Sequence, residues 1–212
     1  MGTARTSDGL TPIVHAVEKD RVLREHRDEV LVAEHDGLLP VLERAARRVE
    51  EDLCVLVDGR FVGGCVCFPS HWRPRDKLSR PVGEIHERVP GYASELSSRV
   101  DSFLRRLTTG TVVGRRNFAI HELPDLFAPD APTTLGVPPP EQWLRSERQT
   151  LSRLPRSSAV LFTIRTQQTQ LGNLSAEVRR KLSDRLQAEP AELIGYRDLT
   201  DRLPALIDWL AS

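Results

Sequence analysis

The expected fold depends most on one stretch, Pro140-Glu141-Gln142-Trp143-Leu144-Arg145-Ser146-Glu147-Arg148-Gln149-Thr150-Leu151-Ser152-Arg153-Leu154-Pro155, followed by the apolar run Ala159-Val160-Leu161-Phe162-Thr163-Ile164. Pro140 suits the first turn of a helix, and Pro155 cannot continue one. Between the prolines, Leu144, Leu151 and Leu154 recur at helical spacing, which predicts a helix over residues 140–155. The apolar run that follows has no polar face and predicts a central strand covered on both sides.

Glu147 interrupts the leucine pattern of this stretch. At about 100° per residue it falls in the middle of the predicted apolar stripe, and Arg148 borders the same stripe. A buried carboxylate is costly unless it is paired or hydrogen-bonded, so Glu147 needs a cation beside it. Either Glu147 and Arg148 form an internal pair that only stabilises the fold, or the carboxylate receives a cationic ligand.

Periodicity elsewhere predicts an α+β fold with one mainly antiparallel sheet. Alternating patterns predict strands near residues 53–57, 61–68, 111–120 and 158–165, and Asp58-Gly59 favours a tight turn between the first two. Helical patterns predict surrounding helices within residues 14–34, 38–50, 91–107, 174–186, 191–194 and 204–210. We expect a polar, flexible segment over residues 1–12 and a single domain with a helical C-terminal tail over residues 13–212.

The composition narrows the range of partners. The chain has 212 residues with 30 basic and 30 acidic side chains, so its formal charge is zero and no basic excess indicates nucleic acid or an anionic membrane. The sequence carries neither a charged-then-apolar leader nor an apolar run of membrane-spanning length, which predicts a cytoplasmic protein. Its three cysteines, an odd number in apolar sequence, favour reduced thiols.

Several residues could take part in a binding site. Cys65 and Cys67 share one strand face, where buried apolar packing is favoured over a partial metal site. Gly63-Gly64 removes side chains from both faces of that strand, for a bulge or for a closely packed body. Arg116 is a cation on an apolar strand face, either reaching to water or meeting a carboxylate in a pocket. His86 sits on a loop or element end, where ligand-binding residues often lie.

Motifs for several other chemistries are absent from the sequence. It contains no Gly-x-Ser-x-Gly elbow, no phosphate-binding loop and no dinucleotide fingerprint, and its cysteines lack the spacing of an iron–sulfur cluster. The chain can therefore form a pocket, but it carries no evident reductase machinery of its own.

Four segments, in order, resemble the haem-dependent oxidative N-demethylase alpha-subunit-like family. They are Cys67–Trp72, then Lys77 with Ile85-His86 and Val89–Tyr92, then Arg116–Phe118, and finally Leu144–Arg156 with Ala159–Ile164. The sequence departs from the family pattern at Arg88, where many relatives carry proline, and at Phe118, which replaces a tryptophan. The resemblance implies a PAS-like fold whose pocket holds haem b. It also implies a reaction in which O2 is the co-substrate and a small amine is oxidised at its N-methyl group.

The resemblance also implies roles for individual residues. His86 is the expected axial ligand of the haem iron, with the thiolate of Cys67 as the weaker alternative. The expected cofactor-binding residues besides His86 are Lys77, Arg116 and Arg145, and the expected catalytic residues are Glu147 and Arg148. Gly63-Gly64 would clear room for the flat cofactor, and Glu147 would hold a protonated amine.

The function implied is that of a haem monooxygenase that demethylates or N-oxygenates a small amine with electrons from a separate reductase. The alternative is a haem PAS module that senses oxygen or another gas without turnover. The sequence offers neither an output domain nor a coiled coil, which favours the enzyme. A relative that kept the fold and lost the haem is a third possibility.

Overall fold

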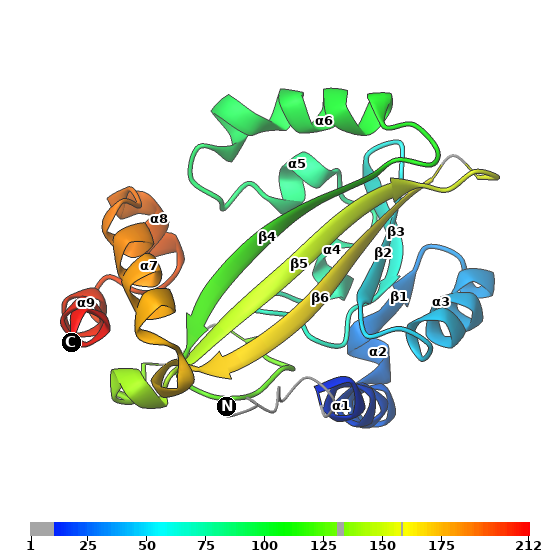
Figure 1. The fold of residues 1–212 in the computed structure, drawn as a ribbon. Helices are drawn as coiled ribbons and strands as arrows, with labels where there is room; N and C mark the ends of the chain where they lie inside the picture. The colour runs from blue at the N-terminus through cyan, green and yellow to red at the C-terminus, as the bar shows by residue number, and fades with distance from the viewer. Residues whose placement is uncertain (1–10, 131–133, 158) are drawn as a thin grey trace, which may run out of the picture.

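The protein folds around one antiparallel sheet in which the strands follow the order β1-β3-β2-β6-β5-β4 (Figure 1). The computed structural model describes residues 11–130, 134–157 and 159–212. The strands are β1 (Leu31–Ala33), β2 (Asp52–Val57), β3 (Arg60–Cys65), β4 (Val112–His121), β5 (Trp143–Arg153) and β6 (Val160–Gln170). The predicted α+β class with a mainly antiparallel sheet is confirmed.

The α-helices are α1 (Thr11–Glu25), α2 (Arg27–Val30), α3 (Leu39–Ala46), α4 (Pro74–Lys77), α5 (Val82–Ile85), α6 (Ser97–Arg106), α7 (Ala176–Gln187), α8 (Ala191–Tyr196) and α9 (Leu203–Ala211). Short helical turns complete the connections: η2 (Asp36–Leu38), η3 (Tyr92–Leu96), η4 (Pro139–Glu141) and η5 (Leu171–Asn173). None of the helices in the described part of the chain has the length and hydropathy needed to cross a bilayer.

The predicted helix over residues 140–155 is wrong, because this stretch forms β5, paired with β4 on one side and β6 on the other. Its leucines do not share a stripe. Leu144 packs with the C-terminal helices on one face of the sheet, whereas Leu151 packs with α6 and its neighbours on the other. The apolar positions change face along the strand, so neither face shows the period of two that marks a half-buried strand.

The other expected elements agree with the structure, with one exception. The four predicted strands correspond to β2, β3, β4 and β6. The predicted helix within residues 14–34 ends early, since residues 31–33 form β1. Most of the expected flexible segment, residues 1–10, lies outside the described residues.

The hairpin between β2 and β3 turns at Asp58 and Gly59, whose φ angles are 48° and 74°. Two consecutive positive φ angles suit the right-handed twist of the strands and explain the Asp-Gly pair.

Gly63 and Gly64 do not clear room for a cofactor. A Cβ on Gly64 would lie 2.7 Å from the carbonyl oxygen of Leu53 and 2.9 Å from Cε2 of Phe61. A Cβ on Gly63 would lie 3.0 Å from a methyl group of Leu38. Protein atoms already fill this space, and the glycines permit close packing beside the bulge between Val55 and Leu56.

The register defines two faces of the sheet. Glu147 lies directly opposite Asn117 of β4 and Thr166 of β6, so these residues share one face, called here the Glu147 face. Their neighbours Arg116, Arg148 and Arg165 point the opposite way, onto what we call the Arg148 face.

Different helices cover the two faces (Figure 1). On the Glu147 face, α5 and α6 pack on β2 and β6 through a cluster that includes Cys54, Leu56, Val82, Leu104 and Val160. On the Arg148 face, α1, α2 and α3 cover one end through Val22, Val30, Leu42, Leu53 and Cys65. The C-terminal helices cover the other end through Ile120, Leu182, Leu186, Ile194 and Leu206.

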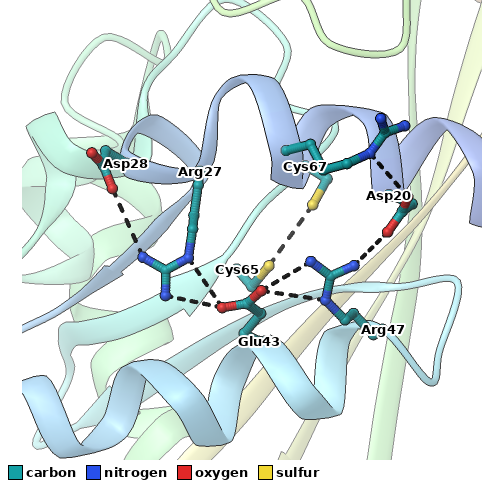
Figure 2. A network of polar contacts seen from close by, with 8 residues as sticks. Asp20, Arg27, Asp28, Glu43, Arg47, Cys65 and Cys67 are labelled. Atoms are coloured by element: carbon teal, nitrogen blue, oxygen red, sulfur yellow. Dashed lines mark hydrogen bonds and ion pairs between the residues drawn. The ribbon is translucent and has the colours of Figure 1, made fainter.

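A surface network of ion pairs joins the first three helices (Figure 2). Glu43 of α3 accepts from Arg27 of α2 at 2.9 Å and from Arg47 at 2.9 Å, and Arg47 also donates to Asp20 of α1. Exposed pairs of this kind contribute about 1 kcal/mol or less each, so the buried apolar cluster beneath them holds the helices.

Candidate functional site

His86 is the C-terminal cap of α5, the helix that packs on the Glu147 face of the sheet through Val82 and Ile85. Its Nδ1 atom lies 2.9 Å from the carbonyl oxygen of Val82, which can only accept a hydrogen bond, so Nδ1 carries the proton and donates. Nε2 makes no hydrogen bond within the described residues. A histidine held in this way offers the lone pair of Nε2, the usual arrangement of an imidazole that ligates a metal.

The surroundings of His86 favour the neutral ring. Burial lowers the pKa of His86, the Val82 carbonyl opposes that change, and the positive charges of Arg115 and Lys77 lower the pKa further. A neutral imidazole is the form that can bind iron.

Tyr92 stacks on His86 with ring centroids 4.9 Å apart and an interplanar angle of 15°. It is buried, and it opens the π-helical turn η3 after Gly91, whose φ is 73°. Burial raises the pKa of Tyr92, so its hydroxyl stays protonated near neutral pH. Such turns are frequent at functional sites, and the stacked ring of Tyr92 restrains the orientation of the imidazole.

A hydrogen-bonded row of polar side chains runs along β5 on the same face. Arg115 of β4 donates from Nε to Oε1 of Gln149 at 2.7 Å, and the Gln149 amide donates to Oε2 of Glu147 at 2.9 Å. Arg145 donates from Nε to Oε1 of Glu147 at 3.4 Å. Glu147 therefore has a donor on each oxygen while its side chain keeps 16% of its surface exposed.

Arg145 is completely buried, and the protein occupies its donors. Besides Glu147, its guanidinium donates to the carbonyl oxygens of Leu126, at 3.0 Å, and Phe68, and to the hydroxyl of Thr166. Burial lowers the pKa of Arg145, although the carboxylates of Glu147 and Asp52 counteract this effect. Arg145 thus positions Glu147 and is not free to meet a ligand itself.

A pair of histidines lies near Arg145. The rings of His71 and His121 stack with centroids 5.0 Å apart, and Nε2 of His121 lies 3.1 Å from the hydroxyl of Ser70. Burial, together with the positive charges of Arg145 and Arg202 and with His71, lowers the pKa of His121 to about 3. In the described part of the chain, no three His, Cys, Asp or Glu side chains gather to hold a bare metal ion.

The structure brings some of the predicted site residues together and separates others. His86, Lys77, Arg145 and Glu147 lie on the Glu147 side of the sheet, and the charge of Lys77 acts on His86. Arg116 and Arg148 are exposed on the opposite face. The expected pairing of Glu147 with Arg148 is wrong, because neighbours on a strand point to opposite faces, and Arg145 is the partner.

Cys67 belongs to a different core cluster from α5, the helix that His86 caps. It is fully buried in the cluster beneath α1 and α3, with its sulfur 3.8 Å from that of Cys65. The hydrogen bond with Cys65 and burial raise the pKa of the Cys67 thiol, which disfavours the thiolate needed for iron binding.

Residue periodicity did not identify Arg115, Gln149, Tyr92 or His121. The available signal was the polar alternation of Arg145, Glu147 and Gln149, which puts three hydrogen-bonding side chains on one face of a strand. The helical spacing of the leucines concealed it.

Comparison with protein-family models confirms the resemblance. The model described as "Haem-dependent oxidative N-demethylase, alpha subunit-like" matches residues 15–206, which include all the elements of the sheet and the positions of His86 and Glu147. The chain therefore belongs to the family of haem-dependent oxidative N-demethylase alpha-subunit-like proteins.

Proposed function

We propose that the protein is a haem-dependent oxygenase that oxidises a small amine with O2 and externally supplied electrons. Family membership supports haem as the cofactor. The single observation that carries the proposal is His86, with Nδ1 bonded to Val82 and its pKa lowered by burial, because this arrangement leaves a neutral Nε2 to bind iron.

The residues around His86 fit haem b. Nε2 of His86 would ligate the iron, and Lys77 and Arg115 would face the carboxylate groups of the cofactor, since both cations act electrostatically on the histidine. Arg115 takes the role that the sequence suggested for Arg116. When bound, haem supplies the activation of O2 that side chains alone cannot provide.

Glu147 is the proposed anchor of the substrate. A protonated amine would pair with its carboxylate, which Arg145 and Gln149 hold in place. Fixing the amine in one orientation can supply several kcal/mol of the reaction barrier. Arg145 is a positioning residue in this account, and Glu147 is the catalytic residue.

Oxidation of an N-methyl group requires two electrons from outside the chain. The amine and O2, with two electrons and two protons, give the demethylated amine, formaldehyde and one water. N-oxygenation would use the same electrons and protons, place the oxygen on nitrogen and also release one water. The sequence has no flavin, nicotinamide or iron–sulfur motif, so we propose a separate reductase, which agrees with the family's description as an alpha subunit.

We further propose that the antiparallel sheet and its helices are a PAS-like fold that places the cofactor between the Glu147 face and the segment from α5 to η3. The stretch of β4 that carries Arg115 and Asn117 on this face is exposed.

A single-turnover measurement tests this function. The haem-loaded protein is reduced photochemically to the ferrous state and mixed with O2, an N-methylated amine and one further equivalent of reductant per haem, which completes the two electrons of one turnover. Formaldehyde and N-oxygenated amine are then quantified. We expect about one equivalent of oxidised product per haem. A protein that binds haem and O2 without oxidising any of a panel of small amines would be a sensor, and the oxygenase proposal would be wrong.

A further inference from the structure

Three arginines stand in one row across the Arg148 face of the sheet. The register pairs Arg116 of β4 directly with Arg148 of β5, and Arg148 directly with Arg165 of β6. Directly opposed side chains on a shared face have Cβ atoms about 4.5 to 5.5 Å apart, and like charges at that separation destabilise a sheet. A row of this kind weakens the isolated protein unless something anionic meets it.

Among the described residues, an acidic side chain meets only one end of the row. Arg165 pairs with Glu50 at 2.6 Å. Arg116 and Arg148 are both exposed, and neither forms an ion pair or hydrogen bond with another residue in the described ranges. Residues 1–10, outside the described part of the chain, carry one basic and one acidic side chain, Arg5 and Asp8, so their sequence has no acidic excess.

We propose that this arginine row is the docking surface for the acidic surface of a partner protein. The row lies between the parts of the Arg148 face that are covered by α1–α3 and by α7–α9. It reaches β4, the last strand of the sheet, whose outer edge has no neighbouring strand among the described residues. The surface is therefore on the opposite side of the sheet from His86, and its occupation does not depend on whether haem binds.

The composition of this surface favours a protein over nucleic acid. The chain as a whole has no net charge, whereas nucleic-acid binding surfaces usually belong to strongly basic domains. Val112, on the same face of β4 as Arg116, is 65% exposed. Arginine beside exposed apolar side chains is typical of protein interfaces, in which guanidinium groups form bidentate contacts with carboxylates.

The binding test uses fluorescein-labelled poly-L-glutamate as an acidic probe for the intact protein. We expect an affinity that falls with salt, and a loss of about tenfold for Arg116→Gln/Arg148→Gln. The matched control is Arg105→Gln/Arg106→Gln, which removes the same charge from exposed positions on α6 and should change the affinity less than about twofold. Equal losses in the two double variants would overturn the proposal.

Other occupants give other results. If duplex DNA bound as tightly as poly-L-glutamate, and Arg116→Gln/Arg148→Gln lost this binding, the row would be a nucleic-acid site. Displacement of the probe by inorganic phosphate at constant ionic strength would make it a small-anion site. If sedimentation velocity showed that the wild type is a dimer and that Arg116→Gln/Arg148→Gln is a monomer, the occupant would be a second copy of the chain. Each of these results contradicts the proposed protein partner.

Thermal unfolding supplies an independent readout. Since opposed arginines repel one another, Arg148→Thr should leave the melting temperature unchanged or raise it. A melting temperature lowered by several degrees would show that Arg148 stabilises the fold, and the proposal would fail. Both readouts are compared at equal haem content and neither measures turnover, so this inference and the oxygenase proposal fail separately.

Discussion

Glu147 and Arg145 lie two residues apart on the same face of β5, with Oε1 of the carboxylate 3.4 Å from Nε of the guanidinium. The arginine is completely buried while the carboxylate keeps some exposure. Because of this difference in burial, we expect Arg145 to act within the protein and Glu147 to act at the candidate site. Separate predictions follow for each residue.

Glu147→Gln should abolish amine binding without disturbing haem. The substitution removes the negative charge and keeps the shape, so the protein should retain its absorption spectrum and lose the spectral shift that amines induce. Stability should fall by about 1 to 2 kcal/mol, because Arg145 keeps its carbonyl partners. Titration of the loaded protein with amine measures the first effect, and urea denaturation the second.

The matched control for this variant is Arg148→Gln, which changes the neighbouring residue on the opposite face. It should leave the amine-induced shift intact. If Glu147→Gln binds amine as the wild type does, the carboxylate is only a structural partner of Arg145.

Arg145→Met should destabilise the protein by about 3 to 5 kcal/mol, because the carbonyl groups of Phe68 and Leu126 lose their donor in a buried setting. Arg145→Lys should recover only part of this loss, since an ammonium cannot reproduce the fork of the guanidinium. Urea denaturation of both variants measures the difference. Wild-type stability in either variant would contradict the positioning role.

Gly64→Ala tests whether the paired glycines serve packing or cofactor binding. The added Cβ would meet the carbonyl oxygen of Leu53 at 2.7 Å, so the free energy of unfolding should fall by about 1 to 3 kcal/mol. Gly37→Ala, with no atom within 4 Å of its Cβ, is the control. If Gly64→Ala had normal stability but failed to bind haem, the paired glycines would serve cofactor binding after all.

Acid should destabilise the protein through His121. Its pKa is about 3 in the folded protein and near 6.5 when unfolded, so the unfolded chain binds an extra proton between these values. Stability therefore falls as the pH drops through this window, by up to about 1.4 kcal/mol per pH unit for this one group. The lowered pKa of His71 acts in the same direction.

Urea midpoints measured at pH values from about 7 down to 4 check this dependence, because that range covers most of the interval in which His121 is neutral in the folded protein but protonated in the unfolded chain. His121→Asn should flatten the profile, whereas His35→Asn, at an exposed position, should not. An unchanged slope in the His121 variant would assign the acid sensitivity to other groups.

The sequence predicted most of the fold because its hairpin, its two-residue alternation and its apolar run are local signals. The strands β2, β3, β4 and β6 follow from them. β5 could not be predicted in this way, since Leu144 and Leu151 pack on opposite faces against different helices. Only the tertiary arrangement determines which positions of such a strand are buried.

The candidate site was predicted only in part from the sequence, because some of its contacts depend on the tertiary arrangement. His86 and Glu147 were identified as candidates, but assigning a helix in place of a strand gave Glu147 the wrong partner, Arg148 instead of Arg145. Arg115 was missed because its relation to Gln149 and His86 depends on strand register and on the packing of α5.

The most direct test of the account is the absorption spectrum of the protein loaded with haem, compared between wild type, His86→Ala and the exposed control His35→Ala. We expect a Soret band in wild type and in the control, and its loss or marked shift in His86→Ala. Imidazole added to His86→Ala should restore the band. Circular dichroism should show that all three proteins are folded. A Soret band unchanged in folded His86→Ala would contradict the assignment of His86 as the iron ligand, and with it the central claim.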